Sequence, residues 1–307
     1  MRMKNKVHIV IWLVLGVMLT SCGGPSSKNE KTADKTQDTL HIWVDTSLAL
    51  FMKEHKKAFE NTYNEPSIQL QFYDEALIVD GLLKNKVSCA VLHRNLNEKE
   101  AGHLKVKEDF PPKQYTFAKD AYACIVSSSS AVDKLALSDL EAYFSGKGAL
   151  SGRIAVENSH AQAVQFIKNR FSLSNEQVSR LYAKNNVQEL LEYLRTDPST
   201  IGIIPFSYIS DQESESTAAM MKGLRVLPVV YTDSIGKTQA IKPSQQSIAT
   251  RQYPLISPVV FVNCNMEKKS GTNFVNYLFK PRGQRLVLKF GLCPAIFPGR
   301  EVNIHTD

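Results

Sequence analysis

The sequence predicts an α/β fold in which strands alternate with helices. Residues 40–44 and 67–73 have the short patterns of β-strands, and residues 87–92 form a continuous apolar strand. Helical patterns occupy the chain between them, at 46–59 and 75–84. A strand–helix–strand–helix–strand order is typical of a parallel sheet covered by helices. About 265 residues follow residue 40, enough for one large domain or two lobes.

The first helix has a clear periodicity. Apolar residues from Leu50 to Phe59 recur at three- and four-residue spacing, which places them on one helix face. Thr46 or Ser47 can act as the N-cap, because a hydroxyl oxygen accepts a hydrogen bond from a free N–H group of the first turn.

The rest of the chain continues the alternation and predicts a second α/β half. We expect strands at 118–127, 153–156, 200–205, 224–230 and 254–262, and helices at 137–144, 162–171, 187–194, 272–279 and 283–290. No internal repeat is present. The chain is expected to pass from the first half to the second near Ala118 and to return near Pro254. Lobe 1 would then contain residues 40–118 and 255–307, and lobe 2 residues 119–254.

The N-terminus indicates export and lipid attachment. Three cations precede an apolar run from His8 to Leu19, and small residues then lead to Cys22. This pattern predicts a signal peptide at 1–21, cleaved before a lipid-modified Cys22. The run is shorter than the roughly 20 apolar residues of an ordinary transmembrane helix, although an uncleaved anchor is the alternative. Residues 22–39 are polar and predict a flexible linker, so the body would be extracytoplasmic and anchored to a membrane.

Charge and motif content exclude several classes of function. The formal net charge is +7, but removal of the three signal-peptide cations leaves 34 basic against 30 acidic residues. This small surplus, without a basic block, argues against a nucleic-acid partner. It is compatible with a small anion but does not by itself indicate one. The sequence lacks the common hydrolase, P-loop and zinc-protease motifs. We therefore expect no enzymatic activity, no cofactor and no metal.

The cysteines show no metal-binding spacing. Cys89, Cys124, Cys264 and Cys293 are widely separated, and the first two lie in strand-like runs. Buried free thiols are the expectation, since a cysteine in an apolar strand behaves as a small apolar residue. An oxidising compartment would also permit disulfides.

Two strand-to-helix turns are candidates for binding a small anion. Ligands of parallel α/β folds sit at the carboxyl ends of strands, where helix N-termini present free N–H groups. The first turn contains Thr46 and Ser47, and the second contains Asn158 and Ser159. All four residue types are also good N-caps, so a purely structural role is the alternative for each turn.

Arg94 is a third candidate because it follows the apolar strand at 87–92. At the end of a strand its guanidinium can offer two parallel hydrogen bonds to a phosphate or a carboxylate. The alternative is an exposed salt bridge.

From Leu40 to Asn303 the order of elements resembles the phosphate-type (PstS-like) solute-binding lipoproteins of ABC importers, in the periplasmic-binding-protein superfamily. The stretches that carry the resemblance are Asp45-Thr46-Ser47, Ala90 to Glu100, Ala118 to Val126, Ile201 to Ser210, Tyr253-Pro254-Leu255 and Gly283 to Ala295. Their order and spacing, rather than any single motif, make the resemblance specific.

The resemblance implies a two-lobed, type II-like fold with two hinge strands and an oxyanion between the lobes. It further implies an ABC permease as partner, phosphate as the first candidate ligand, and a monomer. Thr46, Ser47 and Arg94 would bind from lobe 1, and Asn158, Ser159, His160 and Gln162 from lobe 2. Asp120 matches the family at the crossover, where its carboxylate either is structural or accepts a proton of the ligand.

One stretch departs from the family pattern. Relatives usually carry a run of Ser, Gly and Thr at the start of the second-lobe helix, whereas this chain has Ala161-Gln162-Ala163. Three interpretations follow: phosphate bound through rearranged contacts, another small anion bound with His160 and Gln162 as donors, or a shell that acts as a sensor or protein-interaction module. His160 can also be a solvent-exposed loop histidine.

Overall fold

The computed structural model describes residues 39–63, 67–108, 111–148, 150, 152–158, 162–211, 213–265 and 269–299. The chain from residue 37 onward forms one compact unit. The predicted signal peptide, the lipidation site Cys22 and nearly all of the predicted linker lie outside the described residues. Within the described residues, no helix combines the length and the apolar character needed to cross a membrane.

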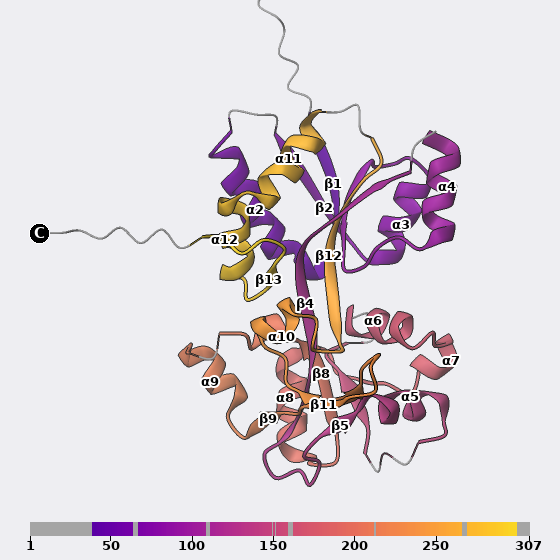
Figure 1. The fold of residues 1–307 in the computed structure, drawn as a ribbon, viewed down its shortest axis with the longest axis vertical. Coiled ribbons are helices and arrows are strands. Elements are labelled where there is room, and N and C mark those ends of the chain that lie inside the picture. The colour runs from indigo at the N-terminus through magenta and orange to yellow at the C-terminus, as the bar shows by residue number, and fades with distance from the viewer. Residues whose placement is uncertain are drawn as a thin grey trace, which may run out of the picture. The chain divides into compact units, whose positions relative to one another are not determined.

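The first half is built on the parallel strands β1 (Leu40–Asp45), β2 (Ile68–Tyr73) and β3 (Cys89–Leu92), in the order β2-β1-β3. Strand β12 (Ile256–Asn263) adds antiparallel to β3. The short strand β13 (Cys293–Pro294) pairs with β4. Helices α2 (Ala49–Glu60), α3 (Glu75–Leu83), α4 (Glu98–Glu108), α11 (Lys269–Phe279) and α12 (Pro281–Lys289) surround this sheet (Figure 1).

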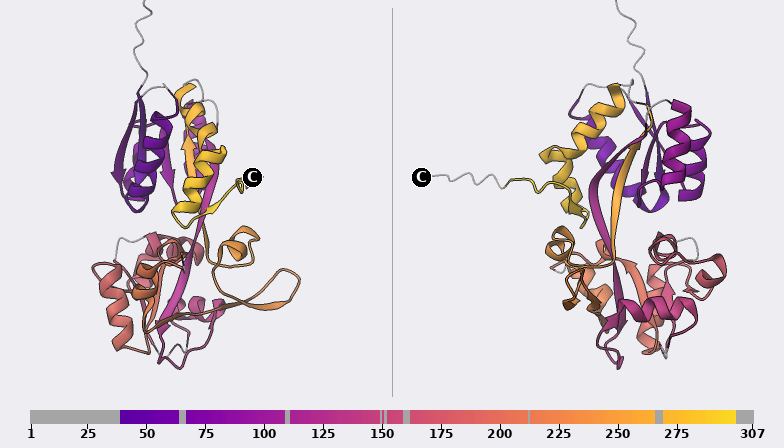
Figure 2. Two further views of the ribbon diagram at one scale, coloured as in Figure 1. Left: turned by 90° about the vertical axis from the view of Figure 1, so that its left-hand side faces the viewer. Right: turned by 45° about the vertical axis from the view of Figure 1, so that its right-hand side comes forward.

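Strand β4 (Lys113–Ser127) links the two halves (Figures 1 and 2). From Lys113 to Ala121 it pairs with β12, and from Tyr122 to Ile125 it pairs with β8 (Ile201–Pro205). Its neighbour therefore changes between Ala121 and Tyr122. A register shift at Val259/Val260 interrupts the β12–β4 pairing, and such bulges increase local twist and bend the strand.

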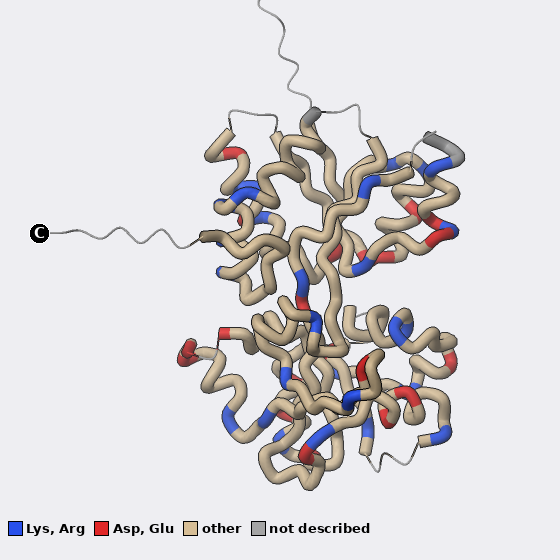
Figure 3. Tube along the Cα trace, in the orientation of Figure 1, with Lys and Arg blue, Asp and Glu red and all other residues tan. Residues whose placement is uncertain are grey.

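The second half continues the sheet in the order β4-β8-β6-β7 and carries a separate three-stranded sheet, β11-β10-β5. Its strands are β5 (Leu135–Ala136), β6 (Ile154–Val156), β7 (Tyr182–Ala183), β8, β9 (Leu224–Val226), β10 (Val229–Thr232) and β11 (Thr238–Ile241). Its helices are α5 (Leu137–Ser145), α6 (Gln162–Arg170), α7 (Asn175–Val178), α8 (Val187–Thr196), α9 (Glu215–Met221) and α10 (Gln245–Ala249). Basic and acidic positions are interspersed over both halves (Figure 3).

Each half has its own apolar core. In the second half, Cys124 of β4 packs in one cluster with Ile203 of β8 and Leu191 of α8. In the first half, one cluster contains Phe117 of β4, and another contains Val260 of β12. Burial of such side chains stabilises the fold by about 25 cal/mol per Å² of apolar surface removed from water.

Several observed elements differ from the sequence expectation. Residues 224–230 were expected as one strand but form two, because β9 pairs with β4 whereas β10 joins the small sheet. Pro228 lies between them and has no N–H group for a sheet. Helix α4 was not expected, since its sequence has no apolar stripe. Among the described residues, the four cysteines form no disulfide with one another, and three of them are buried, whereas Cys264 is half-buried.

Candidate functional site

A cavity of about 410 Å³ lies where β4 passes between the halves. We call it the larger cavity, and we use the names polar wall and apolar wall for the two sets of residues that line it. The polar wall consists of Ser47, His93, Asp120, Glu157, Gln162 and Ser207. The apolar wall consists of Leu48, Leu50, Phe51, Tyr122, Pro205, Tyr208, Phe290 and Leu292. Three acidic residues lie close to it on the polar side, counting Asp45 behind Ser47, and no Lys or Arg is among these described lining residues.

The turn after β1 is closed by its own carboxylate. Asp45 is 2% exposed, and its Oδ1 accepts hydrogen bonds from the Ser47 backbone N at 3.0 Å and the Ser47 Oγ at 2.6 Å. Asp45, rather than Thr46 or Ser47, is therefore the N-cap of the short 3₁₀ helix η1 (Thr46–Leu48) that precedes α2. Burial raises the pKa of Asp45, and the hydrogen bonds from Ser47 oppose that rise. The Asp45 carboxylate thus accepts hydrogen bonds from the Ser47 donors that were predicted to bind a ligand.

Gln162 connects the second half to the same carboxylate. It is the first residue of α6, it is 8% exposed, and its Nε2 donates a hydrogen bond to Asp45 Oδ2. The contact joins the end of β1 to the start of α6, so a single side-chain pair bridges the two halves. Residues next to the two predicted turns are therefore in contact. The protein's own groups already use part of the hydrogen-bonding capacity that a ligand would need.

His93 lies at the end of β3, between the turn after β1 and strand β12. Its Nε2 is 3.0 Å from Ser47 Oγ, and its backbone oxygen accepts a hydrogen bond of 2.9 Å from Ser257 Oγ. Nδ1 has no hydrogen-bond partner among the described residues. Burial lowers the pKa of His93, while the negative charges of Asp120 and Glu75 oppose this effect. A neutral imidazole follows, which can donate or accept one further hydrogen bond.

Asp120 lies where β4 passes between the halves, and its hydrogen bonds connect this part of the strand to the second half. Oδ1 accepts hydrogen bonds from the backbone N atoms of Ala121 at 2.7 Å and Ser207 at 3.1 Å, and Oδ2 accepts one from Ser207 Oγ at 2.7 Å. Ser207 belongs to the 3₁₀ helix η2 (Phe206–Tyr208) that follows β8. Burial raises the pKa of Asp120, and the hydrogen bonds from Ser207 and Ala121 oppose that rise. The carboxylate therefore has a structural role here, while its place on the wall also lets it meet a ligand.

Glu157 is the acidic residue with unused hydrogen-bonding capacity. It follows β6, it is 9% exposed, and its Oε2 has no partner among the described residues. Burial raises its pKa to about 7. A carboxyl group near neutrality in a cavity is a candidate functional group, because its protonation state can change with the ligand. The sequence analysis did not select Glu157, although it begins the second predicted turn.

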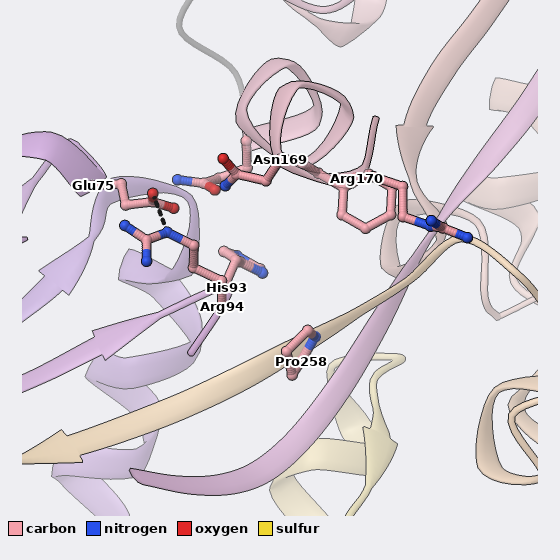
Figure 4. Close-up of a pocket in the computed structure, with 8 residues that line it drawn as sticks. Glu75, His93, Arg94, Asn169, Arg170 and Pro258 are labelled. Atoms are coloured by element: carbon pink, nitrogen blue, oxygen red, sulfur yellow. Dashed lines mark hydrogen bonds and ion pairs between the residues drawn. The ribbon is translucent and has the colours of Figure 1, made fainter. Parts of the chain in front are cut away.

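Arg94 belongs to a neighbouring, smaller cavity of about 240 Å³ (Figure 4). Its Nε donates to Glu75 Oε1 at 2.6 Å, and its Nη1 and Nη2 donate to the two oxygens of Glu100 at 2.8 and 3.0 Å. Nη1 also donates to the backbone oxygen of Asn95 at 2.9 Å. The two parallel hydrogen bonds that were predicted for a ligand are thus made to Glu100. The structure therefore shows the salt-bridge alternative, in a partly buried form. His93 and Gln162 line both cavities.

The other predicted residues lie as follows. Ser47, Asp120 and Gln162 share the larger cavity. Thr46 is exposed and is not among the lining residues of either cavity, whereas Asn158 is half-buried. Ser159 and His160 are outside the described residues. Sequence reasoning missed Asp45 as a capping group and did not select His93, Glu157 or Ser207, although each lies within or next to a quoted motif.

Comparison with known proteins identifies the family to which the chain belongs. Residues 29–282 match the family model described as a PBP superfamily domain, PBP standing for periplasmic-binding protein. No functionally curated protein shows significant sequence similarity to the chain.

Two solved structures share the fold at low sequence identity. An ABC-type phosphate transport receptor from Vibrio cholerae has a TM-score of 0.66 and 15% identity, over 82% of this chain and 98% of that one. PstS from Borrelia burgdorferi has a TM-score of 0.61 and 18% identity, over 83% of this chain and 98% of that one. The family match over most of the chain, together with the strand order and the cavity between two α/β halves, establishes that this protein belongs to the periplasmic-binding-protein superfamily.

Proposed function

We propose that the protein is an extracytoplasmic solute-binding lipoprotein that captures a small solute between its two halves and delivers it to an ABC permease. Membership of the superfamily supports this proposal, as does the predicted lipidation site at Cys22. The observation that carries it is the position of the larger cavity beside the crossover of β4, with walls from both halves. Ligand sites of open α/β sheets typically lie at strand ends of this kind.

Rotation about the crossover strands is the proposed mechanism of capture. β4 and β12 would act as the hinge between lobe 1 (residues 40–118 and 255–307) and lobe 2 (residues 119–254). A ligand that contacts both walls binds the closed arrangement better than the open one, and it shifts the population by that difference in affinity. The Gln162–Asp45 hydrogen bond would also stabilise the closed arrangement, independently of the ligand.

Phosphate is the first ligand to test, because the similar structure from Vibrio cholerae is an ABC-type phosphate transport receptor. Ser47 and Ser207 donate their hydroxyl hydrogens to Asp45 and Asp120, so a neutral Glu157 would bring a carboxylic-acid donor that these contacts leave free. Ionised carboxylates would repel the anion, since no Lys or Arg among the described lining residues compensates them. Phosphate binding should therefore weaken as the pH rises above about 7, the pKa of Glu157.

The second candidate function is a binding-protein shell that serves as a sensor or interaction module. The specific observation in its favour is that Asp45 and Gln162 join the halves with the protein's own groups. In addition, Asp45 already takes the Ser47 backbone N–H. Such a shell would hold its two halves together without a solute.

Isothermal titration calorimetry with phosphate, sulfate and small carboxylates separates the two candidates. For a transport receptor we expect saturable binding to one site, weakened at least tenfold by Ser47→Ala. Thr46→Ala is the matched control, since Thr46 is exposed and lines neither cavity. Silence toward these anions, and toward uncharged and cationic solutes of similar size, at pH 6 and pH 8 would favour the interaction module.

A further inference from the structure

The apolar wall of the larger cavity is extensive for a site that would hold an inorganic anion. Leu48, Phe51 and Leu292 are each 4% exposed, and Tyr122 is 2% exposed. Leu50 and Tyr208 are 67% and 48% exposed, so solvent-accessible apolar surface extends along the same wall. Phosphate presents oxygen on every side and cannot use this wall. A ligand with an apolar body would remove the exposed parts of Leu50 and Tyr208 from water, which is favourable.

The polar wall has the electrostatics of a cation site. Asp45 and Asp120 each accept three hydrogen bonds from protein donors and have limited capacity left. Glu157 Oε2 has no partner among the described residues, although its side chain is about nine-tenths buried in the cavity wall. A buried carboxylate without a partner is unfavourable, so a ligand that supplies a donor and a positive charge relieves that penalty.

A bare metal ion does not fit this wall. Across the part of the chain that the structure describes, no three His, Cys, Asp or Glu side chains are grouped closely enough to hold one. The apolar wall also offers no side-chain carboxylate or amide oxygen of the kind that hard cations require. The positive charge is therefore expected on an organic head group that can form hydrogen bonds.

We propose that the larger cavity binds a small organic monocation, with a protonated amine against Glu157 and a compact apolar body against Phe51, Tyr122 and Leu292. This inference rests on the proposed solute-binding function and names the class of its ligand. The cavity of about 410 Å³ is within the size range of small-molecule sites. The amine donates to Glu157, and His93 on the same wall stays neutral.

The test compares ligands of one shape and different charge. Benzylamine, benzyl alcohol and benzoate, together with inorganic phosphate, are titrated calorimetrically into the purified full-length mature protein at pH 8. We expect benzylamine to bind at least tenfold more tightly than benzyl alcohol, and benzoate and phosphate to bind more weakly than either. Between pH 6 and pH 8 the affinity for benzylamine should rise, because Glu157 becomes ionised.

Matched variants assign the effect to Glu157. Glu157→Gln should weaken benzylamine binding at pH 8 by at least tenfold, whereas Glu141→Gln should not change it, since Glu141 is exposed on α5 and lines neither cavity. Circular dichroism and thermal unfolding establish that both variants are folded. Leu50→Ser, at the exposed edge of the apolar wall, gives a second readout and should weaken benzylamine binding severalfold.

The outcomes separate this inference from the proposed function. Tight phosphate binding without benzylamine binding would overturn the monocation and leave a solute receptor in place. Benzylamine binding that is unchanged in Glu157→Gln would also overturn it, because the contact would lie elsewhere. If none of the four ligands binds at pH 6 or pH 8, the result would count against both the monocation site and the solute receptor.

Discussion

The two strand-to-helix turns that face the larger cavity differ in how their carboxylates are satisfied. Asp45, the last residue of β1, accepts hydrogen bonds from Ser47 and from Gln162 of the opposite half. Glu157, after β6, is similarly buried, but its Oε2 has no partner among the described residues. Burial alone therefore does not mark a ligand-binding group. Unused hydrogen-bonding capacity distinguishes Glu157, which lines the cavity, from Asp45, which stabilises its own turn.

Glu157→Gln should produce the largest effect and should increase stability. The folded-state pKa of about 7 exceeds the reference value of 4.5, so the fold loses stability as the pH rises from 4.5 to 7. The loss is about 3 kcal/mol above pH 7, at 1.36 kcal/mol per pKa unit. Urea unfolding at pH 8 should show a gain of about this size in the variant, and the gain should shrink toward zero near pH 4.5. An equal gain at both pH values would contradict the assignment.

Asp45→Ala should act in the opposite direction. It removes the N-cap of η1 and leaves the Ser47 N–H and the Gln162 amide without their partner. Loss of a cap and a buried unpaired donor predict a destabilisation of about 2 kcal/mol. The same urea titration measures it, with Asp139→Ala on the exposed surface of α5 as control. A neutral result would mean that desolvation of the Asp45 carboxylate cancels its hydrogen bonds.

Gln162→Ala should have the smallest effect on stability, about 1 kcal/mol for one hydrogen bond, but it should alter the arrangement of the halves. The variant lacks the side chain that connects α6 to Asp45. We expect a larger radius of gyration in small-angle X-ray scattering, because the open arrangement becomes more populated. Gln165→Ala, also on α6 and lining neither cavity, is the control. Identical scattering from all three proteins would show that the bridge does not hold the halves together.

Much of the fold could be predicted because local patterns determine it. Apolar runs located β1, β3 and β8 to within two residues, and the superfamily expectation is confirmed by the family match. Polar helix α4 was missed because periodicity detects only helices with an apolar face. The strand expected at 224–230 divides in two because its parts pair in different sheets, which depends on tertiary structure.

The binding residues were harder to predict, because their roles depend on partners distant in the sequence. Ser47 was selected by strand-end reasoning and Gln162 through the family resemblance, and the structure brings both to one cavity. Arg94 could not be assigned from the sequence, since Glu75, 19 residues before it, is one of its ion-pair partners. Nor could Glu157, because a missing hydrogen-bond partner becomes apparent only after folding.

The continuous strand β4 has a consequence for how the molecule unfolds. Fifteen residues without a break contribute Phe117 to one core and Cys124 to the other. One continuous strand therefore takes part in the hydrogen-bonded sheet of both halves. Neither half can lose this strand without removing a central strand from its neighbour, so denaturation is expected as one cooperative event in spite of the bilobal plan.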